Sequence, residues 1–147
     1  MIKFETVGMY DDARNNPTLK STSDVKNHSF LTVDGILYFI DNTIAGDNAY
    51  REGVVIPAGE FLRGYDVRAF EGQKLVADEK HIKYAAKKTY ADIVAGTTLM
   101  SANADGQLEV ITSAPTSGVY FKVTDKTVLT ENAVKVLVMV ADEKASA

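Results

Sequence analysis

The hydrophobic residues of this chain come mostly in short runs that polar, glycine-containing turns separate. The clearest pair is 30–33 and 36–40, two apolar runs joined by Asp34 and Gly35. Asp-Gly favours a two-residue type I′ turn, because both positions of that turn need positive φ. The pattern therefore predicts a β-hairpin over residues 30–40.

A second hairpin is predicted at the centre of the chain. Strands over about 97–101 and 107–111 flank the polar turn 103–106, Asn-Ala-Asp-Gly, whose residues tolerate positive φ. Gly96 marks the bend that leads into the first strand. A calcium loop is a poor interpretation of this turn, because the twelve-residue EF-hand pattern is not met.

An earlier stretch repeats part of this central pattern. Ile-X-Ala-Gly-X-X-Leu occurs at 56–62 and again at 93–99, and a Gly-Gln step follows each copy, at 72–73 and 106–107. Two interpretations stay open. Either one hairpin design is used twice, or the match is a coincidence in a β-rich chain, since two copies are fewer than a repeat array needs.

The remaining elements are predicted from alternation and from turn residues. Residues 78–90 are either a short helix or an irregular crossover, and 129–140 alternates Val at period two, which favours a strand buried on both sides over a helix. Residues 41–53 are predicted as a surface loop. The other expected strands are 54–56, 61–70, 73–77 and 119–123, with Pro57 ending the first and Asp125-Lys126 turning the last.

These elements predict an all-β, mainly antiparallel fold, a compact β-barrel or β-sandwich with at most one short helix. The first 27 residues have few apolar positions after Tyr10 and cannot build a core alone, so they form either a frayed terminus or an arm that a partner orders. We expect an extended N-terminal arm over 1–28, a single β domain over 29–141 and a polar tail over 142–147.

Composition narrows the class of protein. The chain has 147 residues, enough for one domain, and no Cys, which excludes disulfides and thiolate metal sites. The net charge of −4 disfavours nucleic acid and anionic membranes. No apolar run is long enough to span a membrane and the polar start lacks a signal-peptide core, so we expect a soluble protein made in a cytoplasm.

Reaction chemistry is not visible in the sequence. His28 and His81 are the only imidazoles, and no local motif places either beside a nucleophile and an orienting carboxylate. HExxH, GxSxG, GxxxxGK[ST] and GxGxxG patterns are absent. Lysines around 80–88 form either an anion-binding patch or a solvated face whose positive charge is offset by nearby carboxylates. We expect no enzyme, catalytic residue, cofactor or metal site.

The central motifs resemble those of a known family. Ala95-Gly96-Thr97-Thr98-Leu99-Met100, then Asp105-Gly106-Gln107-Leu108 and Gly118-Val119-Tyr120-Phe121-Lys122-Val123, are similar to the small β domains of tailed-bacteriophage capsid decoration (head cement) proteins and head fibre bases. In those proteins an Ala-Gly-Thr-X-Leu strand precedes an Asp-Gly-Lys/Gln-Leu turn. The resemblance covers about residues 54–140.

The resemblance implies a structural virion protein on the outside of a phage capsid, made in the host cytoplasm. Its partner would be the major capsid protein, and the protein would form a homotrimer. The arm would lie across the capsid, where its candidate contact residues are Phe4, Tyr10, Arg14, Pro17 and Leu19. Alternatives are another phage part, such as a tail, baseplate or head fibre, or a β module for small ligands or carbohydrate, which needs an aromatic-lined cleft.

Overall fold

The structure, a computed structural model, describes residues 2–5, 19–42, 54–128 and 131–141, and strands are the main regular element of these residues. The described residues include no α-helix, only three short 3-10 helices. The elements are β1 (Ile2–Phe4), β2 (Val25–Lys26), β3 (Ser29–Val33), β4 (Ile36–Ile40), β5 (Val55–Ile56), β6 (Gly64–Asp66), η2 (Val67–Phe70), β7 (Lys74–Asp78), η3 (Glu79–His81), β8 (Ile82–Lys83), η4 (Tyr90–Asp92), β9 (Leu99–Ala102), β10 (Leu108–Ile111), β11 (Gly118–Val128) and β12 (Asn132–Ala141).

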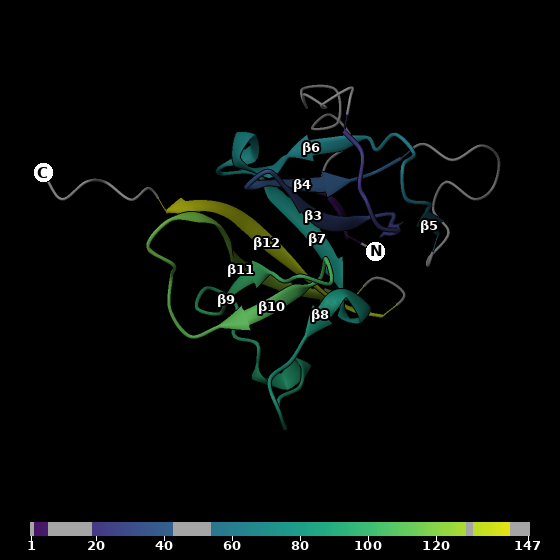
Figure 1. Cartoon of the computed structure of the whole chain (residues 1–147). Coiled ribbons are helices and arrows are strands. Elements are labelled where there is room, and N and C mark those ends of the chain that lie inside the picture. The colour runs from purple at the N-terminus through teal and green to yellow at the C-terminus, as the bar shows by residue number, and fades with distance from the viewer. Residues whose placement is uncertain (1, 6–18, 43–53, 129–130, 142–147) are drawn as a thin grey trace, which may run out of the picture.

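The strands form three open sheets (Figure 1). The largest has seven strands in the order β1-β7-β12-β11-β9-β10-β8, the second has three in the order β3-β4-β6, and β2 pairs with β5. Every pair is antiparallel except β8 with β10. The all-β, mainly antiparallel prediction is confirmed, and because the sheets are open, the sandwich is the better of the two expected architectures.

The main core lies between the three-stranded and the seven-stranded sheets. Phe30 and Phe39 of the smaller sheet join Phe121 and Val136 of the larger one in a single buried cluster. The rings of Phe30 and Phe121 lie 5.2 Å apart, centroid to centroid. Burial of these aromatic and branched side chains removes apolar area from water and holds the layers together.

Both predicted hairpins are confirmed. Asp34 and Gly35 have φ of 52° and 78°, as a type I′ turn requires, between β3 and β4. The turn between β9 and β10 is held by Asn103, whose Oδ1 accepts the amides of Asp105 (3.0 Å) and Gln107 (2.9 Å). The residues of each turn therefore determine where the chain reverses direction in both hairpins.

The ambiguous C-terminal segment is a strand, as the valine alternation predicted. Val134, Val136 and Val138 of β12 are fully buried, and β12 pairs with β11 and β7 on its two edges. The turn expected at Asp125-Lys126 is wrong. Both residues continue β11 beyond an irregularity between Val123 and Asp125, because the pairing with β12 extends through them.

The repeated sequence pattern repeats turns, not a hairpin. Gly59 and Gly96 both have positive φ, of 83° and 85°, and so do Gly72 and Gly106, of 84° and 79°. In the second copy β9 pairs with β10, whereas in the first β5 pairs with β2, and β7 pairs with β1 and β12. A doubled hairpin is therefore not present.

Two other segments differ from expectation in part. Residues 78–90 form the irregular crossover and not the helix, since Asp78 ends β7 and Ile82 pairs in parallel with Leu108. Only 64–66 of the expected strand 61–70 is extended in a sheet, because the Asp66 carboxylate accepts the Arg68 amide (3.0 Å) and starts η2. Of the loop predicted over 41–53, residues 43–53 lie outside the described residues.

The described parts of the expected arm are built into the fold. Ile2–Phe4 pairs with β7 at the edge of the large sheet, and Leu19 and Val25 belong to a second hydrophobic cluster with Ile40 and Leu62. These stretches differ from a free arm because their apolar side chains are buried. Met1 and residues 6–18, the remainder of the expected arm, lie outside the described residues.

Candidate functional site

A polar cleft of about 460 Å³ lies between the β2–β3 turn, η3 and the turn of the β9–β10 hairpin. Its floor includes the buried residues Ser29, Phe30 and Gly106. The charged residues Asp24, Lys26, Lys80 and Asp105 stand at its rim and are exposed. The size is that of a small-ligand site.

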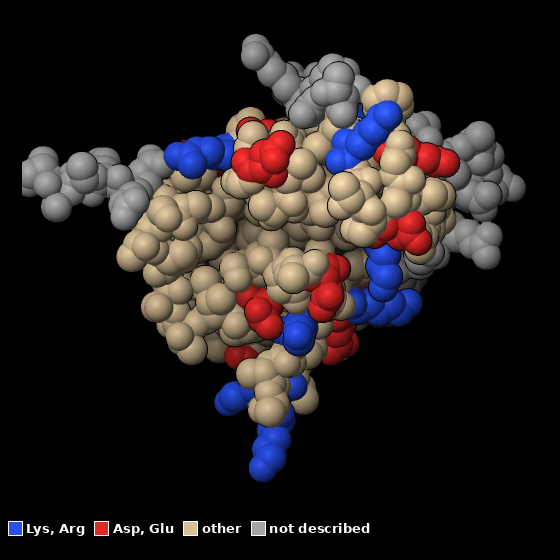
Figure 2. Space-filling view, viewed as in Figure 1, with Lys and Arg blue, Asp and Glu red and all other residues tan. Residues whose placement is uncertain are grey.

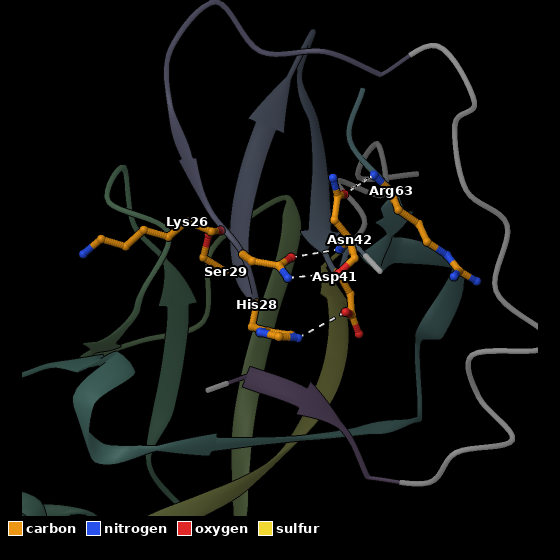
Figure 3. A network of polar contacts seen from close by, with 7 residues as sticks. Lys26, His28, Ser29, Asp41, Asn42 and Arg63 are labelled. Atoms are coloured by element: carbon orange, nitrogen blue, oxygen red, sulfur yellow. Dashed lines mark hydrogen bonds and ion pairs between the residues drawn. The ribbon is translucent and has the colours of Figure 1, made fainter. Parts of the chain in front are cut away.

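The β2–β3 turn presents different side chains to its two sides (Figure 3). Lys26 and Ser29 line the cleft, and the Ser29 hydroxyl donates to the Lys26 carbonyl oxygen at 2.6 Å. His28 points the other way, and its Nε2 lies 3.1 Å from Oδ1 of Asp41. The chain makes this reversal with His28 at a φ of 58°, and the His28 amide donates to the Ile40 carbonyl at 2.8 Å.

Two asparagines hold the cleft wall that the β2–β3 turn forms, on the side away from the cleft. Asn27 donates through Nδ2 to the Asn42 carbonyl (3.1 Å), and its Oδ1 accepts the Asn42 amide (2.8 Å). Asn42 in turn donates through Nδ2 to the Phe61 carbonyl (3.0 Å), and its Oδ1 accepts the Arg63 amide (2.5 Å). These bonds pair backbone groups of residues 42, 61 and 63 with side chains, so they fix the position of the wall.

His81 reaches the cleft from η3 and is oriented by a carboxylate. Its Nδ1 lies 2.6 Å from Oδ1 of Asp78, a residue that is only 7% exposed. Burial would raise the pKa of Asp78, but hydrogen bonds and positive charge, including those of His81, lower it below its ordinary value. Asp78 is therefore ionised at neutral pH, and its carboxylate orients the His81 ring through Nδ1.

The cleft does not assemble a nucleophile on this wall. The hydroxyl proton of Ser29, a floor residue, is directed at the Lys26 carbonyl and not at an imidazole. Within the described part of the chain, no group of three or more His, Asp and Glu side chains is placed to hold a metal ion. The described lining combines charged side chains with hydrogen-bonding groups.

The outer face of the seven-stranded sheet is the second candidate site. Its register places Ile111 opposite Leu99, Leu99 and Leu137 on either side of Lys122, and Tyr120 opposite Met139. Neighbouring Met100, Phe121 and Val138 are fully buried, so strand alternation turns this set away from the core. We call Leu99, Ile111, Tyr120, Leu137 and Met139 the outer patch.

The outer patch is partly exposed. All its members have intermediate exposure, and neither hydrophobic cluster of the described residues includes any of them. It lies on segments without any charged residue, 93–104, 110–121 and 136–141, apart from the central Lys122. Figure 2 shows a broad surface at the left without Lys, Arg, Asp or Glu, near the β10–β11 connection.

The residues proposed for partner contact from the sequence fall in other places. Phe4 is 3% exposed and packs against Phe39, Tyr65 and Phe70, with ring centroids 5.2, 5.6 and 4.7 Å away. Leu19 is 2% exposed in the second cluster. Both side chains are core residues in this structure. Tyr10, Arg14 and Pro17 lie outside the described residues.

The lysines around 80–88 do not act as one patch. Lys80 lies 3.6 Å from Glu131 and Lys88 lies 3.9 Å from Asp92, and only Lys80 and His81 of this group line the cleft. Sequence reasoning missed both candidate sites. The uncharged runs 93–104 and 110–121 signalled the outer patch, but the cleft joins three distant segments and leaves no local pattern.

Comparison of the chain with family models, curated proteins and solved structures gave no match. No helix among the described residues has the length and apolar character needed to cross a membrane. The function of the chain is therefore inferred from its own geometry and from the motif resemblance above.

Proposed function

We propose that this protein is a structural virion component that binds the outside of a bacteriophage capsid through the outer patch and stabilises the assembled lattice. One observation supports this most, the partly exposed apolar face that Leu99, Tyr120 and Leu137 share on the large sheet. An apolar surface rimmed by polar residues gains free energy when a partner removes it from water.

The strands that carry the family resemblance also carry part of the outer patch. The motif segments Ala95–Met100 and Gly118–Val123 supply Leu99 and Tyr120 to the outer patch, on β9 and β11. The long β11–β12 hairpin gives that face a rigid support, because it pairs on both edges with other strands. A protein that binds only the assembled lattice stabilises the lattice by mass action.

Other classes of function have less support. Another phage part, such as a tail, baseplate or head fibre, would use the same kind of surface and is told apart by its failure to bind purified capsids. A carbohydrate module needs aromatic side chains in its cleft, and Phe30 is the one Phe or Tyr in the described lining. We also propose that three copies assemble, which size-exclusion chromatography with light scattering measures.

Co-sedimentation with mature capsids of the encoding phage tests the proposed surface. Leu137→Lys adds a second positive charge, beside Lys122, to the outer patch, and we expect it to weaken capsid binding at least about tenfold. Val128→Lys is the matched control. It makes the same kind of change on the same hairpin, at a residue that is 69% exposed and outside the patch, so binding should persist.

Thermal melts of both variants confirm that the fold is kept. The proposal is wrong if the wild-type protein does not pellet with capsids. The patch is the wrong surface if Leu137→Lys binds as well as Val128→Lys does.

A further inference from the structure

We propose that the capsid surface covered by the outer patch presents a carboxylate to Lys122, set among apolar side chains. Lys122 lies in the middle of the patch, opposite Leu99 on one neighbouring strand and Leu137 on the other. A partner that covers the patch therefore covers this lysine too. The inference rests on the capsid binding proposed above and adds the chemistry of the partner.

Lys122 differs from two other lysines of the same sheet face. Register and strand alternation place Lys74 and Lys135 on the face that carries Lys122. Lys74 lies 3.5 Å from Asp125, and Lys135 lies 3.4 Å from Glu5. Among the described residues, the side chain of Lys122 has no ion-pair or hydrogen-bond partner, and it is partly exposed. Its charge is therefore left for a partner to neutralise.

The outer patch cannot supply the opposite charge itself. The segments that surround Lys122, 93–104, 110–121 and 136–141, contain no charged residue. Glu109 of the same sheet lies opposite Ser101, on a strand that β9 separates from β11. Moving an ammonium group out of water is strongly unfavourable unless an opposite charge and hydrogen bonds replace the water. The carboxylate has to come from the partner.

The same lysine disfavours a second copy of this chain as the occupant of the patch. In a two-fold interface the same surface of both copies meets, so an interface centred on Lys122 would bring two lysines together. The five residues of the outer patch are all uncharged and would not offset this repulsion. A different molecule with complementary charge fits the patch better.

A series of charges at position 122, measured by co-sedimentation with mature capsids of the encoding phage, tests the proposal. Lys122→Met keeps a long unbranched side chain and removes the charge. We expect it to bind at least about thirtyfold more weakly, because the partner's carboxylate is left buried and unpaired. Lys122→Arg keeps the charge and should bind more tightly than Lys122→Met. Lys83→Met is the matched control, the same change at an exposed lysine of β8, and should bind as the wild type does.

Melting temperatures of the variants show whether each remains folded. Wild-type protein that does not pellet with capsids overturns the proposed function and this inference with it. If the wild type pellets and Lys122→Met binds as well or better, capsid binding stands and the carboxylate partner is wrong. An equal loss in Lys83→Met also contradicts the inference, because it would indicate unspecific charge attraction.

Discussion

Gly106 joins the two sheets through a contact that no side chain mediates. Its φ is +79°, and the space where its Cβ would be is filled by the Phe30 carbonyl oxygen. The turn that carries Gly106 can therefore pack directly on β3. A residue with a side chain would have to separate the hairpin from the smaller sheet and open the cleft floor.

We expect Gly106→Ala to destabilise the protein more than Gly72→Ala. Both positions have positive φ, so alanine costs each roughly 1–2 kcal/mol. Gly72 has open space where its Cβ would be, whereas at Gly106 the added atom also meets Phe30. Urea unfolding of the two variants measures the difference. Equal losses of free energy would contradict the close backbone contact.

Strand β1 shows how burial can anchor a very short element. It has three residues and pairs on one edge only, with β7, yet Ile2 is 0% and Phe4 is 3% exposed. The Phe4 ring contacts aromatic residues of β4, β6 and η2. Strand β1 is therefore held in place mainly by the packing of its buried side chains.

Truncating that ring tests the role of β1. We expect Phe4→Ala to lower the free energy of unfolding by about 3–5 kcal/mol, the usual range for a buried Phe. Phe61→Ala is the control. Phe61 is 61% exposed, and loss of its ring should change stability by less than about 1 kcal/mol. Chemical denaturation measures both, and a small loss for Phe4→Ala would show that β1 is not part of the core.

Elements set by local chemistry were predictable from the sequence, and those set by distant pairing were not. Asp34-Gly35 and the Asn103 side chain determine their turns within a few residues, so both hairpins followed. β1 was missed because its partner is β7, far along the chain. Polar residues at 125–126 suit a turn or an exposed strand equally, and only the pairing with β12 decides between them.

The candidate sites illustrate the same limit. The alternation of β11 and β12 was visible, but which of the two faces points to solvent depends on where the smaller sheet packs. The cleft depends on three segments that the fold brings together, 23–31, 80–81 and 104–107. Charge and turn patterns along a single stretch cannot reveal such a site.

The whole molecule presents two surfaces of opposite character. The outer patch is apolar with one lysine at its centre, and the cleft is polar with charges of both signs. The two surfaces have no residue in common.

Hydroxyl-radical footprinting of the free and the capsid-bound protein shows whether the outer patch is the surface that faces the capsid. Met139 and Tyr120 carry reactive side chains in the outer patch, and Phe61 is a reactive and exposed side chain outside it. If the outer patch binds the capsid, binding lowers the oxidation of Met139 and Tyr120 and leaves Phe61 unchanged. Unaltered oxidation of Met139 and Tyr120 in capsid-bound protein would show that another surface makes the contact.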